Sequence, residues 1–147
     1  MISRGFPNIL SNDLATAKQW YVDLLGWESE FDSDWFVHLK SPTAPNVELG
    51  ILDAKHEIVP SSVSSVSGGT LLTFVVDDVE VVYQRASELG HAVLEPPTDL
   101  FYGQRRMILA DPDGTHIDIS SDCPPSKRVP RQPRSPFRAL TQDDSPL

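Results

Sequence analysis

The chain has 147 residues, 39% of them hydrophobic, which suits one domain with a sizeable core. It has no apolar run of about 18 residues and no signal-peptide pattern, so we expect no membrane span and a cytoplasmic location. Residues 1–120 hold 7 basic and 18 acidic side chains, a net charge of −11 that disfavours nucleic acid and favours a cationic ligand. Acidity that only aids solubility is also compatible with this composition. The single Cys123 excludes an intrachain disulfide.

The first part of the chain reads as a strand, a helix and a meander. Apolar residues at helical spacing predict a helix from Leu14 to Leu25, with Asp13 as its N-cap and Gly26 as its left-handed stop. The first strand carries Phe6, and short alternating segments predict three strands after the helix. These segments are Trp27–Glu30, Trp35–Lys40 and Val47–Leu52.

The second part repeats this order. A strand from Leu71 leads to Asp78 as an N-cap, a helix over Val79–Leu89 and a stop at Gly90. Strands are then predicted over the segments Ala92–Glu95, Arg106–Ala110 and Thr115–Ser120, the last two joined by the hairpin residues Asp111-Pro112-Asp113-Gly114. An internal repeat of this length constrains the fold more than any single motif.

The repeat also divides the chain. We expect a first βαβββ module over residues 1–53 and a second over residues 70–120. The Ser- and Gly-containing residues 54–69 are expected to form a linker, which leaves open whether the modules pair within one chain or across a dimer. Residues 121–147 are rich in Pro and Arg and are expected to be extended or disordered.

Several ordered motifs resemble those of the vicinal oxygen chelate superfamily, which includes glyoxalase I, extradiol dioxygenases and bleomycin-resistance proteins. The resemblance covers about residues 5–120. It implies an α+β fold in which two βαβββ modules form a cupped mixed sheet, with the helices outside and the site inside the cup, and it implies a homodimer. The motifs are Asn12-Asp13-Leu14, Trp20-Tyr21, Leu24-Leu25-Gly26, Asp77-Asp78-Val79, Tyr102-Gly103-Gln104-Arg105 and Asp111-Pro112-Asp113-Gly114.

The resemblance also implies where a metal would bind. Metal-dependent members place one ligand on the first strand and one on the last strand of each module. The first-strand positions match Phe6 and Leu71, and the last-strand positions match Glu48 and Asp118. Because Phe and Leu offer no nitrogen or oxygen donor, we expect no bound metal. The sequence also has no glycine-rich phosphate loop, zinc-type cysteine pair or Gly-x-Ser-x-Gly motif, so we expect no other cofactor and name no catalytic residues.

Loss of the metal would leave an apolar cup edged by carboxylates. Such a cup resembles that of bleomycin-resistance proteins, so we expect sequestration of a cationic or aromatic ligand, such as an antibiotic, without chemistry. The alternatives are a metal-dependent lyase, isomerase or dioxygenase that uses Glu48 and Asp118, or a structural dimer with a vestigial pocket. No nucleic acid or membrane partner is expected. The predicted ligand-binding residues are Phe6, Asn8, Trp35, Glu48, Leu71, Thr73, Phe101, Tyr102, His116 and Asp118.

Overall fold

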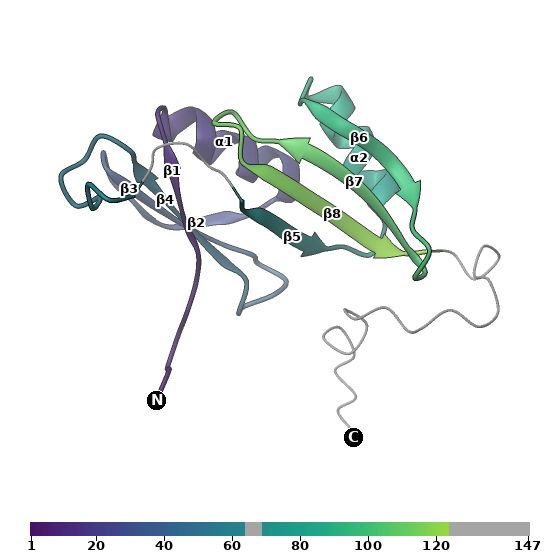
Figure 1. The fold of residues 1–147 in the computed structure, drawn as a ribbon, viewed down its shortest axis with the longest axis horizontal. Helices are drawn as coiled ribbons and strands as arrows, with labels where there is room; N and C mark the ends of the chain where they lie inside the picture. Colours follow the sequence, from purple (N-terminus) through teal and green to yellow (C-terminus); the bar gives the residue numbers. More distant parts are fainter. Residues whose placement is uncertain (64–68, 124–147) are drawn as a thin grey trace.

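The computed structural model describes residues 1–63 and 69–123 of the chain. These residues form two βαβββ modules (Figure 1), which confirms the predicted α+β fold. The first module contains β1 (Asn8–Ser11), α1 (Leu14–Leu25), β2 (Glu28–Asp32), β3 (Phe36–Lys40) and β4 (Glu48–Asp53). The second contains β5 (Leu71–Val75), α2 (Val79–Glu88), β6 (Val93–Asp99), β7 (Gln104–Ala110) and β8 (His116–Asp122). No helix of the described ranges is long and apolar enough to cross a membrane.

The predicted linker and tail are described only in part. Residues 64–68 of the linker and 124–147 of the tail lie outside the described residues. The last strand, β8, continues to Asp122 and so passes the expected module end at residue 120.

Each module forms its own mixed four-stranded sheet, in the orders β1-β4-β3-β2 and β5-β8-β7-β6. The first strand pairs in parallel with the last, and the other pairs are antiparallel. Strand alternation sends one set of side chains toward the helices, including Leu49 and Ile51 of β4 and Ile117 and Ile119 of β8, all fully buried. The opposite sheet face, which we call the open face, carries the intervening residues.

The helix α1 covers the predicted residues, and α2 begins at the predicted Val79 and ends at Glu88, one residue before the predicted Leu89. Asp13 caps α1 by accepting hydrogen bonds from the amide of Thr16 at 3.1 Å and from its hydroxyl at 2.8 Å. Asp78 caps α2 by accepting from the Glu80 amide at 2.9 Å. The glycine after α1, Gly26, has a φ of 66°, a conformation that costs little without a Cβ atom.

The prediction that the strand β6 ends at Glu95 was wrong. The strand continues through Pro96 and Pro97 to Asp99. Proline lacks an N–H to donate, but β6 is an edge strand whose pairing with β7 is irregular on both sides of Glu95. An edge with bulges tolerates proline because the missing donor has no ladder partner to lose.

The two modules of one chain share a hydrophobic core and a buried polar contact. The phenol of Tyr21, on α1, donates a 2.6 Å hydrogen bond to Oδ2 of Asp111, in the β7–β8 turn. Burial raises the pKa of both groups, while the Tyr21 hydrogen bond and two backbone amides act in the opposite direction on Asp111. Trp27 also packs edge-on against Phe74, with ring centroids 5.0 Å apart. The modules therefore pack against each other within the chain.

Candidate functional site

A groove of about 740 Å³ lies where the two modules meet. Its walls are the segment before β1, the β3–β4 connection and the strand β5, which is the edge of its sheet. Most of the lining is apolar, and Trp27, Leu71 and Phe74 contribute to it beside the polar side chains of Glu48 and Thr73. This volume and mixture are typical of small-molecule sites. The groove thus brings together three of the predicted site residues, Glu48, Leu71 and Thr73.

A cluster of charged and aromatic side chains surrounds Glu48 at one wall of this groove. Nε and Nη2 of Arg4 each lie 2.8 Å from Oε2 of Glu48, and the Arg4 guanidinium carbon lies 5.1 Å from the ring centroid of Phe6. The His38 ring is 5.1 Å from that of Phe6, and its Nε2 is 3.3 Å from the same Glu48 oxygen. We call Arg4, Phe6, His38 and Glu48 the Glu48 cluster.

The alternation of two paired strands positions the Glu48 cluster. On β3, Val37 and Leu39 are buried in the core, so His38 points to the open face. On β4, Leu49 is buried in the core, and Glu48 lies on the same face as His38. Phe6 precedes β1, which pairs in parallel with β4. Three segments distant in sequence therefore converge on one carboxylate.

The electrostatics of the cluster favour an ionised Glu48. Its side chain is only 10% exposed, yet the hydrogen bond from Arg4 lowers the pKa of Glu48, and His38 contributes a smaller effect in the same direction. His38 Nε2 also lies 3.1 Å from Nη2 of Arg4. Because arginine only donates, the Nε2 of a neutral His38 either accepts from Arg4 or donates to Glu48. The Arg4 guanidinium and the His38 ring therefore contact the same oxygen of Glu48.

Asn8 fills the open face beside this cluster. It pairs with Gly50 across β1 and β4. A Cβ atom at Gly50 would lie 1.9 Å from Oδ1 of Asn8 and 2.9 Å from Cε2 of Phe36. Because Gly50 has no side chain, the Asn8 amide can lie directly over the backbone of β4.

The predicted acid of the second module, Asp118, is held by neighbouring hydroxyls. It accepts hydrogen bonds from Thr73 Oγ1 at 3.2 Å and from Ser120 Oγ at 2.6 Å, and it is buried. His116 is exposed, and its Nδ1 lies 3.2 Å from the carbonyl oxygen of Gly114. Asp118 thus adjoins the groove through Thr73, while His116 contacts its own turn.

The strand register does not match Glu48 with Asp118, the two acids that were expected at equivalent positions of the modules. Asn8 and Thr73 each lie five residues before their helix cap, and they pair with Gly50 and Asp118. Asp118 therefore corresponds to Gly50, and Glu48 corresponds to His116. The reason is the β3–β4 turn, closed by Ser41 N to Val47 O, which is two residues longer than the β7–β8 turn closed by Asp111 N to Thr115 O.

The residues at the metal-ligand positions that the resemblance implies do not form a set of metal ligands. Phe6 and Leu71 have no donor atom, and both Glu48 and Asp118 already bind protein groups. His116, which the register matches to Glu48, is exposed and contacts the carbonyl of Gly114. Within residues 1–63 and 69–123, no three His, Cys, Asp or Glu side chains come together in a group that could hold an ion. A divalent metal needs several such ligands at nearly fixed distances.

Three predicted aromatic residues lie away from the groove. Trp35 stacks on His56 with ring centroids 4.9 Å apart and sits beside Asp53, at the end of β4 opposite to Glu48. Phe101 and Tyr102 form an edge-on pair at 5.1 Å in the turn between β6 and β7. That turn adjoins the end of β8, whereas Leu71 pairs with its beginning.

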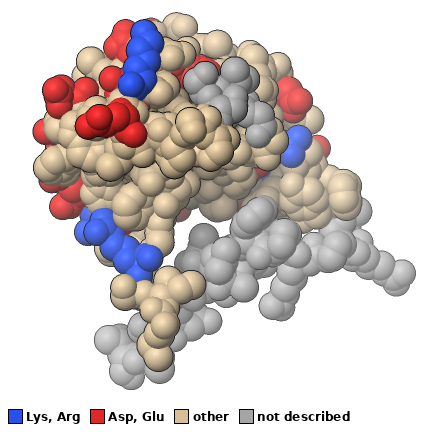
Figure 2. Space-filling view, turned by 60° about the vertical axis from the view of Figure 1, so that its left-hand side comes forward, with Lys and Arg blue, Asp and Glu red and all other residues tan. Residues whose placement is uncertain are grey.

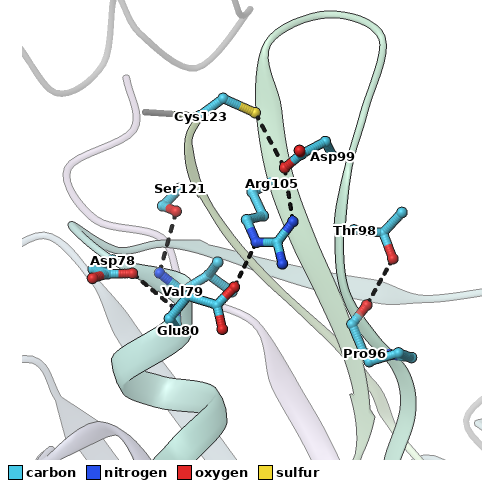
Figure 3. Close-up of polar contacts among 9 residues, drawn as sticks. All are labelled: Asp78, Val79, Glu80, Pro96, Thr98, Asp99, Arg105, Ser121 and Cys123. Carbon is cyan, nitrogen blue, oxygen red and sulfur yellow. Dashed lines mark hydrogen bonds and ion pairs between the residues drawn. The ribbon is translucent and has the colours of Figure 1, made fainter. Parts of the chain in front are cut away.

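Arg105, the last residue of the motif Tyr102-Gly103-Gln104-Arg105, forms hydrogen bonds that link a helix and a strand (Figure 3). Its Nε donates to Glu80 on α2 at 2.6 Å, and its Nη1 donates to Asp99 on β6 at 2.8 Å. These two carboxylates, Asp99 first, raise the pKa of Arg105. Cys123 Sγ lies 3.6 Å from the same Asp99 oxygen. The guanidinium therefore ties the first turn of α2 to the edge of the second sheet.

Sequence reasoning missed two members of the Glu48 cluster. His38 could have been found from strand parity, because it alternates with the core residues Val37 and Leu39. Arg4 left no such signal, since it precedes the first strand and no periodicity covers it. The face of the molecule shown in Figure 2 carries more acidic than basic side chains.

Comparison with known proteins agrees with this architecture. The model of the Glyoxalase/Bleomycin resistance protein/Dioxygenase superfamily matches residues 5–119. No curated protein matches the chain. Among solved structures, a glyoxalase-related enzyme from Fulvimarina pelagi is 21% identical with a TM-score of 0.71, the similarity covering 83% of this chain and 89% of that one.

Two further solved structures are similar over nearly their whole lengths. A member of the superfamily from Sphaerobacter thermophilus is 22% identical, with a TM-score of 0.66 and coverage of 83% of this chain and 98% of that one. A family enzyme from Burkholderia phytofirmans is 20% identical, with a TM-score of 0.67 and coverage of 80% and 96%. These structures share the fold, and the family model matches most of the sequence. The chain therefore belongs to the glyoxalase/bleomycin resistance protein/dioxygenase superfamily.

Proposed function

We propose that the protein binds and sequesters a small ligand that has a cationic group and an aromatic or apolar body, and that it does so without chemistry. The observation that carries this proposal is that Glu48 and Phe6 already bind a planar cation, the guanidinium of Arg4. A carboxylate beside an aromatic face is selective for such groups, because charge and ring quadrupole attract the same ligand.

The groove supports the proposal that the ligand has an aromatic or apolar body. Trp27, Leu71 and Phe74 line it next to Glu48, so an apolar body could lie along β5 while its cationic end reaches the carboxylate. Burial of such a body would supply affinity in proportion to the apolar area removed from water. An antibiotic with a cationic tail, as in the bleomycin-resistance members that this chain resembles, is one ligand of this class.

We further propose that the protein acts as a homodimer and has no nucleic acid partner. The acidic body supports the second statement, because residues 1–120 carry a net charge of −11 and would repel a phosphate backbone. The superfamily resemblance supports the first.

Calorimetric titration with cationic and aromatic antibiotics tests the proposal. We expect at least one compound to bind, with an affinity that weakens in Glu48→Gln and with added salt. Glu57→Gln is the matched control, since it removes the same charge from an exposed side chain outside the groove lining. If Glu48→Gln and Glu57→Gln weakened the affinity equally, the loss would come from the change in net charge alone. Glu48 would then have no specific role in binding.

Metal analysis of protein purified without chelators tests the competing metal-dependent chemistry. Stoichiometric iron, zinc, nickel or manganese would overturn sequestration without chemistry and favour a lyase, isomerase or dioxygenase. We expect substoichiometric metal, because the donor set around Glu48 and Asp118 is incomplete in the described chain.

A further inference from the structure

Arg4 makes the contacts that a cationic ligand would make. Its guanidinium contacts Oε2 of Glu48 through two nitrogens at 2.8 Å, approaches Nε2 of His38 at 3.1 Å and lies over the ring of Phe6. These four contacts use the carboxylate, the imidazole and the aromatic face of one cluster. No second carboxylate is hydrogen-bonded to Arg4 among the described residues.

The segment that carries Arg4 is weakly attached. Residues 1–7 belong to no helix or strand, and in Figure 1 the N-terminal end extends away from the two sheets. The first backbone hydrogen bond in chain order runs from the Gly50 amide to the Pro7 carbonyl, at 2.9 Å, and within the described chain the preceding residues are attached only through the side chains of Arg4 and Phe6. The Arg4 side chain itself is 57% exposed, whereas that of Glu48 is 10% exposed. Arg4 can therefore leave without disturbing β1, but Glu48 cannot.

From this geometry we infer that Arg4 is a tethered competitor, which occupies Glu48 in the free protein and must be displaced by the cationic group of a ligand. This inference rests on the proposed function. It also narrows the class of ligand. The group that replaces Arg4 must be a planar nitrogen cation, such as an amidinium or guanidinium, that fits the Glu48 carboxylate and the Phe6 ring.

The competition sets the size of the expected effect. We call the form with Arg4 on Glu48 closed and the form without this contact open. At the strength of a solvent-exposed ion pair, the contact favours the closed form over the open form by roughly 1.4- to 5-fold. The affinity for a competing cation is reduced by the fraction of open sites. Removal of Arg4 should then tighten binding by roughly two- to sixfold.

Benzamidine is a suitable probe, since it joins a planar amidinium to an aromatic ring. Its dissociation constant would be measured by amide chemical-shift titration of the full chain. We expect tighter binding by Arg4→Ala, an intermediate effect of Arg4→Lys, and weak binding by Glu48→Gln whether or not Arg4 is present. In the wild type, saturation with benzamidine should also release the segment, seen as a lower heteronuclear NOE at Gly5.

Arg85→Ala controls for net charge. Arg85 is exposed on the last turn of α2 and makes no polar side-chain contact within the described ranges. Affinity of Arg4→Ala no greater than that of Arg85→Ala would overturn the competition. If Glu48→Gln still weakened the probe in that case, the proposed site would survive; if Glu48→Gln had no effect, both ideas would fall. Matching amide spectra of the variants would show that each is folded.

Discussion

The contact between Tyr21 and Asp111 is expected to hold the two modules together, and Tyr21→Phe tests it. The substitution removes one hydroxyl and keeps the ring in the core. The lost hydrogen bond is 2.6 Å long and ends on a buried carboxylate. A hydrogen bond to a charged group contributes about 1.5–3 kcal/mol. The Oδ1 atom of Asp111 still accepts hydrogen bonds from two backbone amides, those of Asp113 at 2.9 Å and Thr115 at 2.8 Å, so the buried carboxylate keeps hydrogen-bond donors. We therefore expect a loss of about 2 kcal/mol in the free energy of unfolding.

Urea unfolding and thermal melting provide the assay. For a chain of this length each kcal/mol corresponds to about 2–4 °C, so the melting temperature should fall by roughly 4–8 °C. Tyr83→Phe is the control, because Tyr83 packs against the same core and its hydroxyl makes no hydrogen bond among the described residues. Equal stability of the two variants would refute the argument that the Tyr21 hydroxyl ties the modules.

The same variant makes a pH prediction. The pKa of Asp111 is raised in the fold, so ionisation of this group favours the unfolded chain and its contribution to stability is lost as pH rises through the folded pKa. The Tyr21 hydrogen bond opposes that shift by lowering the pKa. Without it the pKa of Asp111 rises further, and the stability deficit of Tyr21→Phe should be larger at neutral pH than in acid. A deficit that shrinks toward neutral pH would contradict this sign.

Three further substitutions test other parts of the structure. Gly50→Ala should cost about 1–3 kcal/mol in urea unfolding by overpacking, and Asn8→Ala in the same chain should recover much of it; equal costs with and without Asn8 would show that its amide is not the obstacle. Arg105→Ala should cost about 1 kcal/mol because it breaks two partly exposed ion pairs, and Arg105→Lys should recover less than half, since lysine cannot fork. Asp13→Ala should lower the urea midpoint through loss of the α1 cap, and Asp13→Asn, which retains an acceptor, should lower it less.

The sequence predicted the parts of the fold that depend on local physics. The bounds of α1 follow from a cap at Asp13, an apolar stripe and the stop at Gly26, and the structure places the helix over the predicted residues. The end of β6 was predicted too early because Pro96 and Pro97 usually break a strand. Their tolerance depends on the position of β6 at a sheet edge, and this position is a property of the whole sheet.

The candidate site was harder to predict because it depends on turn lengths and on a segment without periodicity. Strand parity correctly separates Leu49 from Glu48, since each face of a half-buried strand leaves a pattern. The resemblance matched Glu48 with Asp118, but the β3–β4 turn is two residues longer than the β7–β8 turn, so the register matches Glu48 with His116. Arg4 was missed because contacts made by an irregular terminal segment leave no pattern to read.

This unequal turn also bears on how a ligand would lie. If the modules were equivalent, two carboxylates would face each other and a symmetric dication would suit the groove. Instead, Glu48 corresponds to the exposed His116, and the buried Asp118 corresponds to Gly50. Asp118 is satisfied by two hydroxyls, whereas Glu48 relies on Arg4 and His38. One end of the groove can therefore exchange its cation and the other offers mainly apolar surface, so we expect a ligand with a single charge at one end.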